Sequence, residues 1–170
     1  MANRVPLNVF IVGDSVYYND SRYVFFQLYQ ANPFLEIGNH SFSHAYKHYH
    51  FYDEHPAGVV KDFDLNDDTL CLQTKTARLP GRNTWRINGR KKTDLPDDST
   101  AADMLSEKNF HIFGRDLEWR CNDDSCHSIQ NANILMQKIE GMVQKNNSFI
   151  PGNIIILCHE AMFLTADNRI

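Results

Sequence analysis

The 170-residue sequence has no long hydrophobic run and no excess of positive charge. No segment approaches the roughly 20 apolar residues of a membrane-spanning helix, and the first residues lack the basic and apolar pattern of a secretory signal. The formal net charge of −4 argues against a nucleic-acid partner, which requires a concentrated basic face. We therefore expect a soluble chain with no membrane span, no nucleic-acid partner and no export address.

Cysteine is scarce, and the four present do not define a redox compartment. Cys71 and Cys158 lie in apolar or strand-like contexts, where a free cysteine behaves as a small hydrophobe. Cys121 and Cys126 flank a short polar loop, a spacing that permits a small disulfide loop, two free thiols or, with His127, a weak metal site. The sequence leaves these alternatives open.

Internal repeats and low-complexity segments are also absent, and 42% of the residues are hydrophobic. That composition predicts one globular domain over residues 1–170 with enough apolar material for a core. Short apolar runs that end in polar motifs alternate with helical patterns, which indicates parallel β/α units with function at one rim. The expected strands are 7–12, 34–39, 75–79, 109–113 and 153–158, and the expected helices are 21–30, 100–108 and 128–145.

Two segments show no regular pattern. Residues 46–73 are rich in aromatics, histidine and aspartate, and without the alternation of a calcium loop they indicate a solvated turn region. Residues 86–92 are locally basic and are interpreted as a solvated loop.

The most informative stretch places His40 and His44 four residues apart, after a Gly-Asn turn and together with Ser41 and Ser43. On a helical turn, positions i and i+4 share a face, so both imidazoles could aim at one point. Neutral imidazole is a common ligand of zinc and similar ions. The expected strand before them ends at Asn39, and active sites gather at the carboxyl ends of parallel strands.

These residues resemble the metal-binding motif of the polysaccharide deacetylases, the NodB-homology enzymes of carbohydrate esterase family four. Three further stretches resemble that family's motifs in the expected order. The matching stretches are Glu36-Ile37-Gly38-Asn39-His40-Ser41-Phe42-Ser43-His44, Arg78-Leu79-Pro80-Gly81-Arg82, Gly114-Arg115-Asp116-Leu117-Glu118-Trp119 and Leu157-Cys158-His159-Glu160. The resemblance covers residues 9–163 and implies an α/β fold, a distorted incomplete (β/α) barrel.

The resemblance also implies roles for individual residues. A divalent metal, zinc or else cobalt, would be held by His40 and His44, with second-shell hydrogen bonds from Ser41 and Ser43. His159 would be the general acid, Asp116 would orient it, and Arg78 would keep that carboxylate ionised. The expected substrate pocket is formed by Trp119, Leu157, Pro80 and Gly81. The substrate class is carbohydrate that carries N-acetyl or O-acetyl groups.

The sequence departs from the family in one important respect. Family members carry an Asp-Asp motif on a first strand, which supplies the base and the third metal ligand, and no such pair precedes or ends the strand at 7–12. Asp14 is a weak substitute, because it lies at the end of a neighbouring strand. The chain could be a fragment truncated at one or both ends, a silent family member, or an enzyme that takes its carboxylate from a second copy.

A sheet that lacks its first strand exposes an edge, so a homo-oligomer is expected. If the chain is a fragment of a longer protein, we expect that protein to be secreted or located in the cell envelope. The leading hypothesis is thus a metal-dependent deacetylase domain. The absence of the Asp pair would make this chain inactive. Its alternative is a catalytically silent carbohydrate-binding or scaffold domain of the same fold, and a third hypothesis is a plain α/β domain with accidental motif matches.

Overall fold

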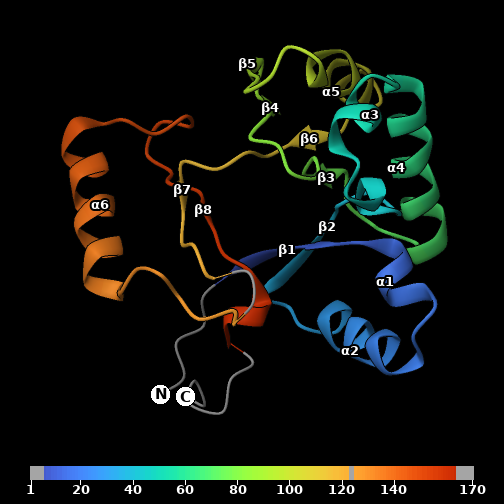
Figure 1. Ribbon diagram of the computed structural model, residues 1–170, viewed down its shortest axis with the longest axis horizontal. Helices are drawn as coiled ribbons and strands as arrows, with labels where there is room; N and C mark the ends of the chain where they lie inside the picture. The colour runs from blue at the N-terminus through green and yellow to red at the C-terminus, as the bar shows by residue number, and fades with distance from the viewer. Residues whose placement is uncertain (1–5, 123–124, 164–170) are drawn as a thin grey trace. The chain divides into compact units, whose positions relative to one another are not determined.

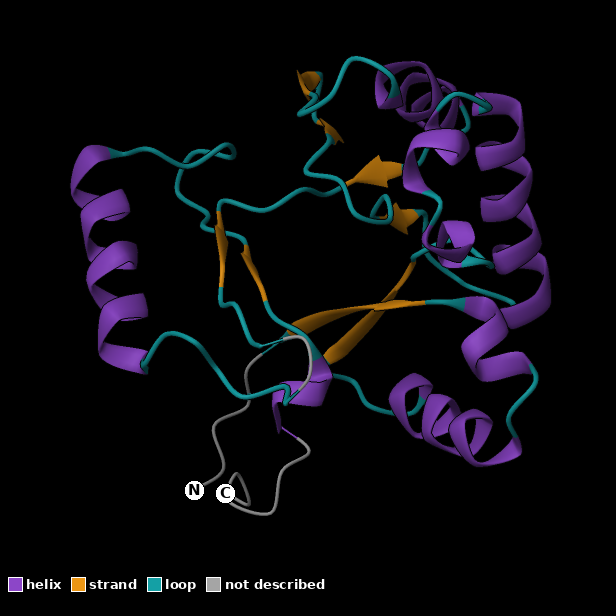
Figure 2. Ribbon diagram, viewed as in Figure 1, coloured by secondary structure: helices purple, strands orange, loops and turns teal. Residues whose placement is uncertain are grey.

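The computed structural model describes residues 6–122 and 125–163. They form a mixed α/β fold with a mostly parallel central sheet, as the alternating pattern predicted (Figures 1 and 2). The chain divides into two compact units, Met1–Gly114 and Arg115–Ile170, and each is described by itself.

The first unit contains the six-stranded sheet and five helices. Its strands are β1 (Leu7–Ile11), β2 (Leu35–Asn39), β3 (Thr76–Ala77), β4 (Trp85–Ile87), β5 (Arg90–Lys92) and β6 (His111–Ile112). Its helices are α1 (Gly13–Tyr17), α2 (Asp20–Gln30), α3 (Tyr49–Asp53), α4 (Pro56–Leu70) and α5 (Asp98–Glu107), with a 3₁₀ segment at His44–Lys47. The second unit contains β7 (Leu117–Glu118), α6 (Ala132–Lys145), β8 (Ile156–Leu157) and a 3₁₀ segment at Glu160–Phe163.

The strand order of the large sheet is β1-β2-β3-β6-β4-β5. Strands β1, β2, β3 and β6 are parallel, with Ile11 beside Asn39, Asn39 beside Ala77, and Ala77 beside Ile112. The carboxyl ends of these four strands therefore meet at one rim. The β4–β5 hairpin continues the sheet antiparallel to β6.

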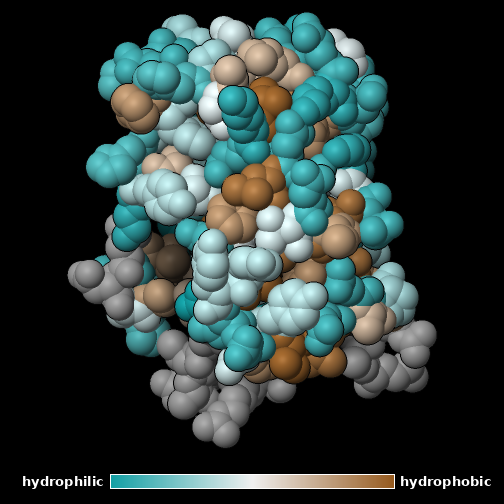
Figure 3. All heavy atoms as spheres, turned by 90° about the vertical axis from the view of Figure 1, so that its right-hand side faces the viewer, coloured by the Kyte–Doolittle hydropathy of each residue, from teal (hydrophilic) through white to brown (hydrophobic). Residues whose placement is uncertain are grey.

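The main core of the first unit lies between α4, α5 and the central strands. Its buried residues are Val59, Val60, Phe63, Ala77, Leu79, Ala101, Ala102, Leu105, Phe110 and Ile112. A smaller cluster joins Val16, Phe26 and Leu70 near α1 and α2. On the face in Figure 3, apolar residues appear as separate brown groups between hydrophilic ones.

The prediction of a solvated turn region over residues 46–73 is wrong, because this segment forms α3 and the long helix α4. Pro56 begins α4 at a position where its missing N–H costs nothing, and Cys71 ends the helix with a left-handed backbone. Val59, Phe63 and Leu70 recur at helical spacing and are buried. Two of the aspartates between them, Asp62 and Asp67, accept hydrogen bonds from Ser43 and Asn39.

The basic segment 86–92 is also a regular element rather than a solvated loop. It forms the β4–β5 hairpin around Asn88 and Gly89, both of which have positive φ, at 51° and 72°. An Asn-Gly pair favours this tight hairpin turn because both residues tolerate that backbone conformation. The other predicted elements are present with shifted bounds: the helix expected at 128–145 begins at Ala132, and the strand expected at 153–158 is two residues long.

Cys71, Cys121, Cys126 and Cys158 are all free thiols. The residues that the structure describes include no helix with both the length and the apolar composition needed to cross a bilayer.

Candidate functional site

The two histidines of the central motif lie beside each other at the carboxyl rim of the first unit's sheet. His40 directly follows β2, and its backbone N–H donates to the carbonyl of Ile11 at the end of β1 (3.1 Å). The ring centroids of His40 and His44 are 4.9 Å apart in an edge-to-face arrangement. The sequence prediction that a strand end delivers the histidines is therefore confirmed.

A backbone contact fixes the orientation of the His40 ring. Its Nδ1 lies 2.8 Å from the carbonyl oxygen of Arg78, which follows β3. A carbonyl only accepts, so Nδ1 carries the proton and Nε2 carries the lone pair of the neutral ring. Metal-binding histidines are oriented in this way, with one ring nitrogen donating to a carbonyl and the other turned to the metal.

His40 and His44 do not share a helical turn, although their i, i+4 spacing predicted one. Ser41 has a φ of 65°, and His44, Ala45, Tyr46 and Lys47 have φ values of 50°, 56°, 44° and 65°. A left-handed backbone costs about 1–2 kcal/mol for each such residue, so the surrounding structure must hold this loop in place.

The Asn39 side chain holds the histidine loop, residues 40–47, in place. Its side chain is fully buried, and its Nδ2 donates to the Phe63 carbonyl (2.8 Å) and to Asp67 Oδ1 (2.6 Å). Its Oδ1 accepts from the Ser41 backbone N–H (2.8 Å) and from Asn66 Nδ2 (2.8 Å). The Asn39 amide thereby ties the histidine loop to α4.

A second anchor is Asp62, one of the aspartates of α4. Its Oδ2 accepts from the Ser43 hydroxyl (2.9 Å), the Ser43 backbone N–H (3.2 Å) and the Tyr52 hydroxyl (2.9 Å). Burial and the Asp62 charge raise the pKa of Tyr52 far above its usual value, so its hydroxyl remains a donor. Ser41 contributes as well, since its Oγ accepts from the His44 N–H (3.0 Å).

The segment that carries the arginine motif packs against the same loop through Tyr49. The Tyr49 hydroxyl lies 3.4 Å from His44 Nδ1, and its ring lies beside Gly81, which has a φ of 66°. Arg82 forms an ion pair with Asp53, and both side chains are largely buried. Pro80, expected to line the substrate pocket, is fully buried.

Arg78 is buried and spans two strand ends. Its backbone N–H donates to the Asn39 carbonyl (3.0 Å), and its guanidinium Nη1 donates to the carbonyls of Phe113 (3.3 Å) and Gly114 (2.8 Å). These contacts lie within the first unit. The predicted partner, Asp116, belongs to the second unit.

The second unit brings together the remaining predicted residues around β7 and β8. Asp116 accepts from the backbone N–H groups of Phe149 (2.8 Å) and Ile155 (2.9 Å), one with each carboxylate oxygen. The half-buried Trp119 donates through its backbone N–H to the Leu157 carbonyl (2.8 Å). His159 is exposed just after β8.

A pocket of about 510 Å³ opens beside His44 in the first unit. Asp14, from the first turn of α1, lines the same pocket. Within residues 6–122 and 125–163, no group of three or more His, Cys, Asp or Glu side chains is arranged to hold a metal ion. His40 and His44 are the two predicted ligands that the described structure brings together.

Sequence reasoning missed the residues that hold the loop, namely Asn39, Tyr49, Tyr52 and Asp62. Asn39 lies inside the matched motif, so its position was a usable signal. The others act from α3 and α4, where the sequence pattern predicts a turn region.

The sequence matches no model of a known protein family and no curated protein.

Proposed function

We propose that the chain is a metal-dependent hydrolase domain that removes acetyl groups from N-acetylated or O-acetylated carbohydrate. The observation that carries this proposal is the adjacent pair His40 and His44 at the carboxyl rim, with the His40 ring oriented by the Arg78 carbonyl. In this proposal the fold is a distorted, incomplete (β/α) barrel of the polysaccharide deacetylase type.

The donor set suits zinc, and cobalt as its usual substitute, because both accept imidazole nitrogen ligands. Such a metal would polarise the acetyl carbonyl and activate water. The His40 Nδ1 is held by the Arg78 carbonyl, the kind of contact that orients the ring of a metal-binding histidine. Tyr49 would restrain His44 from its other side.

The other roles follow the family resemblance. His159 would protonate the departing amine and Asp116 would orient it, while Arg78 would favour the ionised carboxylate. Trp119 and Leu157, which are linked by a backbone hydrogen bond, would receive the acetyl methyl group. The base and the third metal ligand must come from a carboxylate outside the matched motifs, and a homo-oligomer could supply it from a second copy.

A catalytically silent carbohydrate-binding or scaffold domain is the second candidate. The contacts of Asp116 favour it, because both carboxylate oxygens accept backbone N–H groups and so serve to hold β7 and β8 together. A catalytic aspartate usually keeps one oxygen directed at its histidine.

Zinc titration followed by calorimetry tests the metal site. We expect binding near one equivalent, and His40→Ala or His44→Ala should weaken it by at least about tenfold, since each removes a ligand. His50→Ala is the matched control, because His50 is an exposed histidine of α3 that belongs to no proposed metal site. Equal affinities for all four proteins would refute the assignment.

Acetate release from a chito-oligosaccharide, with zinc or cobalt added, distinguishes the two candidates. Turnover that depends on His40 and His159 supports the hydrolase. Zinc and oligosaccharide binding without acetate release supports the silent domain. Turnover that persists in both His40→Ala and His159→Ala would show that the assigned roles are wrong.

A further inference from the structure

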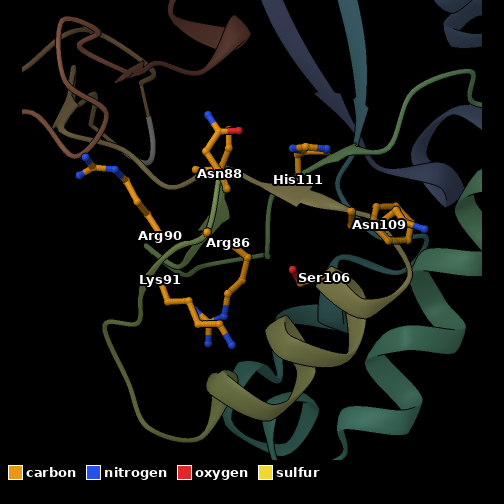
Figure 4. Close-up of a pocket in the computed structure, with 10 residues that line it drawn as sticks. Arg86, Asn88, Arg90, Lys91, Ser106, Asn109 and His111 are labelled. Carbon is orange, nitrogen blue, oxygen red and sulfur yellow. The ribbon is translucent and has the colours of Figure 1, made fainter.

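Two pockets of the first unit differ in what they offer a ligand. The pocket at the β4–β5 hairpin is lined by basic side chains (Figure 4), but the donors of two of them are already taken by protein groups. Arg86 Nε and Lys91 Nζ both donate to Asp103 Oδ1, at 2.6 and 2.8 Å. The pocket beside His44 instead presents side chains that make few contacts within the protein.

This second pocket lies between α1 and the histidine loop, and we refer to it as the His44 pocket. Backbone hydrogen bonds hold its two walls together, since the Gly13 N–H donates to the Ser41 carbonyl (3.2 Å) and the Asp14 N–H to the Phe42 carbonyl (3.0 Å). A pocket with fixed walls avoids the ordering cost that weakens binding at flexible surfaces. Its lining residues are Val12, Asp14, Ser15, Ser43, His44, Tyr46 and Lys47.

Tyr46 is the most unusual residue of the lining. Its φ is 44°, a left-handed conformation that bulky residues rarely adopt. The loop nevertheless turns this side chain to the solvent, where it is 67% exposed. Within residues 6–122 and 125–163, the Tyr46 side chain has no hydrogen bond, ion pair or ring contact. Backbone strain of this kind is concentrated at functional sites, so Tyr46 is a candidate binding residue.

The charged side chains of the His44 pocket balance each other, with a carboxylate from Asp14 and an ammonium group from Lys47. Among the described residues, the Asp14 carboxylate contacts only the Ser15 hydroxyl (3.3 Å), and the Lys47 ammonium has no partner. Ser43 gives its hydroxyl proton to Asp62 and keeps its lone pairs. Donors and acceptors without an excess of one charge suit an uncharged ligand with several hydroxyl groups.

We propose that the His44 pocket binds an uncharged sugar ring of the substrate, with the Tyr46 ring stacked on the apolar face of the sugar. A pyranose has C–H groups on its faces and hydroxyl groups around its rim, so it matches an aromatic ring flanked by donors and acceptors. The pocket volume of about 510 Å³ lies in the roughly 300–1,000 Å³ range of small-molecule sites.

Asp14 would accept hydrogen bonds from the sugar hydroxyls, and Lys47 would donate to them. These residues differ from Trp119 and Leu157, which belong to the second unit and are predicted to receive the acetyl methyl group. The sugar would lie beside the predicted metal ligand His44, so this proposal rests on the proposed function.

Calorimetric titration of the metal-free protein with a chito-oligosaccharide tests the proposal. Tyr46→Ala should weaken binding by about tenfold, because it removes the stacking surface. Tyr46→Phe keeps the ring and should bind nearly as tightly as the parent protein. Both variants should fold, because the Tyr46 ring is exposed and the neighbouring Ala45 already occupies a left-handed conformation.

Tyr23→Ala is the matched control, because Tyr23 is an exposed tyrosine of α2 that does not line the pocket. The proposal is overturned when the parent protein does not bind the oligosaccharide or when Tyr46→Ala binds as tightly as the parent. It is also overturned when Tyr23→Ala weakens binding as much as Tyr46→Ala.

Zinc titration and acetate release report on the proposed hydrolase separately, because the sugar titration is done without metal. Oligosaccharide binding that depends on Tyr46, without zinc binding or acetate release, supports the sugar site and refutes the hydrolase. Acetate release that depends on His40 but is unchanged in Tyr46→Ala supports the hydrolase and refutes the sugar site.

Discussion

The two units differ in how many side chains they bury, because the first unit buries polar side chains in addition to its apolar core. In the first unit, the fully buried residues include the polar side chains of Asn39, Ser41, Asn66 and Asp98. In the described part of the second unit, Leu135 and Met162 are the buried apolar residues. Helix α6 instead exposes much of its apolar face, with Ile134, Met136 and Val143 each more than 40% exposed.

The two units therefore hold their candidate site residues in place in different ways. The histidine loop of the first unit is held by buried side chains, each of which satisfies several backbone groups. In the second unit, β7 and β8 are held mainly by backbone hydrogen bonds and by Asp116. We expect mutations of polar residues to be much more damaging in the first unit.

Asn39→Ala should produce the largest effect. The substitution leaves the Ser41 N–H, the Phe63 carbonyl and the Asp67 carboxylate without their amide partner. Each buried polar group left without a partner costs about 1–3 kcal/mol, so the free energy of unfolding should fall by about 3 kcal/mol or more. Urea unfolding measures this loss. Asp116→Ala in the second unit should cost less, and an equal cost would contradict the comparison.

Gly114→Ala should be the next most destabilising. A Cβ at Gly114 would lie 2.2 Å from Trp85 Nε1 and 2.4 Å from Asn83 Oδ1, and Trp85 is fully buried. Overpacking of this kind costs about 1–3 kcal/mol. Thermal unfolding should show a lower Tm. A Tm equal to that of the parent protein would mean that the packing around Trp85 is looser than described.

Asp98→Asn should change how stability depends on pH. Asp98 is fully buried, and its burial, followed by the nearby Asp94 and Asp53 charges, raises the pKa of its carboxyl despite a hydrogen bond from Thr84. The single Thr84 hydroxyl contacts both Asp94 and Asp98, and it has one proton for two carboxylates. A protonated Asp98 resolves this shortage, because it can donate to Thr84 while Thr84 donates to Asp94.

The sign of the pH effect follows from the raised pKa of Asp98. Between the ordinary pKa and the raised pKa of Asp98, the folded protein binds more protons than the unfolded chain, so stability falls as pH rises. Asp98→Asn removes this slope and should raise the Tm at pH 7. Asp103→Asn is the opposite control: its lowered pKa stabilises the fold at neutral pH, so this variant should lower the Tm there, with the loss fading in acid.

Gly141→Ala should give the smallest effect, in the opposite direction. Gly141 lies within α6, and apart from its chain neighbours and the helix's own backbone no described atom lies within 4 Å of the Cβ that alanine would add. Replacing a helical glycine by alanine stabilises by about 0.5–1 kcal/mol, because it reduces the freedom of the unfolded chain. A slightly higher Tm is expected. Destabilisation would show that α6 packs more closely than the described contacts indicate.

The sequence predicted the central strands because their apolar runs are local signals. The strand at 34–39 and the position of His40 after it were predicted correctly. Helix α4 was not predicted, because its four aspartates are typical of a solvated turn. Val59, Phe63 and Leu70 nevertheless have helical spacing. The hairpin at Asn88-Gly89 was also readable and was overlooked.

The geometry of the candidate site was less predictable. The left-handed conformations of Ala45 and Tyr46 have no signature in those residue types, which rarely adopt them. They depend on hydrogen bonds from the loop to two side chains. One is the buried Asn39, and the other is Asp62, which lies on a different helix later in the chain. Contacts of this kind arise only in the folded protein, so local sequence patterns do not contain them.

The run of positive φ values at His44–Lys47 also has a consequence for protein engineering. Asparagine and glycine are the replacements that this backbone accommodates best, whereas valine and isoleucine would clash with their own main chain. A mutagenesis library at Ala45 or Tyr46 should therefore yield folded clones mostly with small or amide side chains. The backbone conformation would therefore decide which substitutions fold, before any difference in activity could be selected.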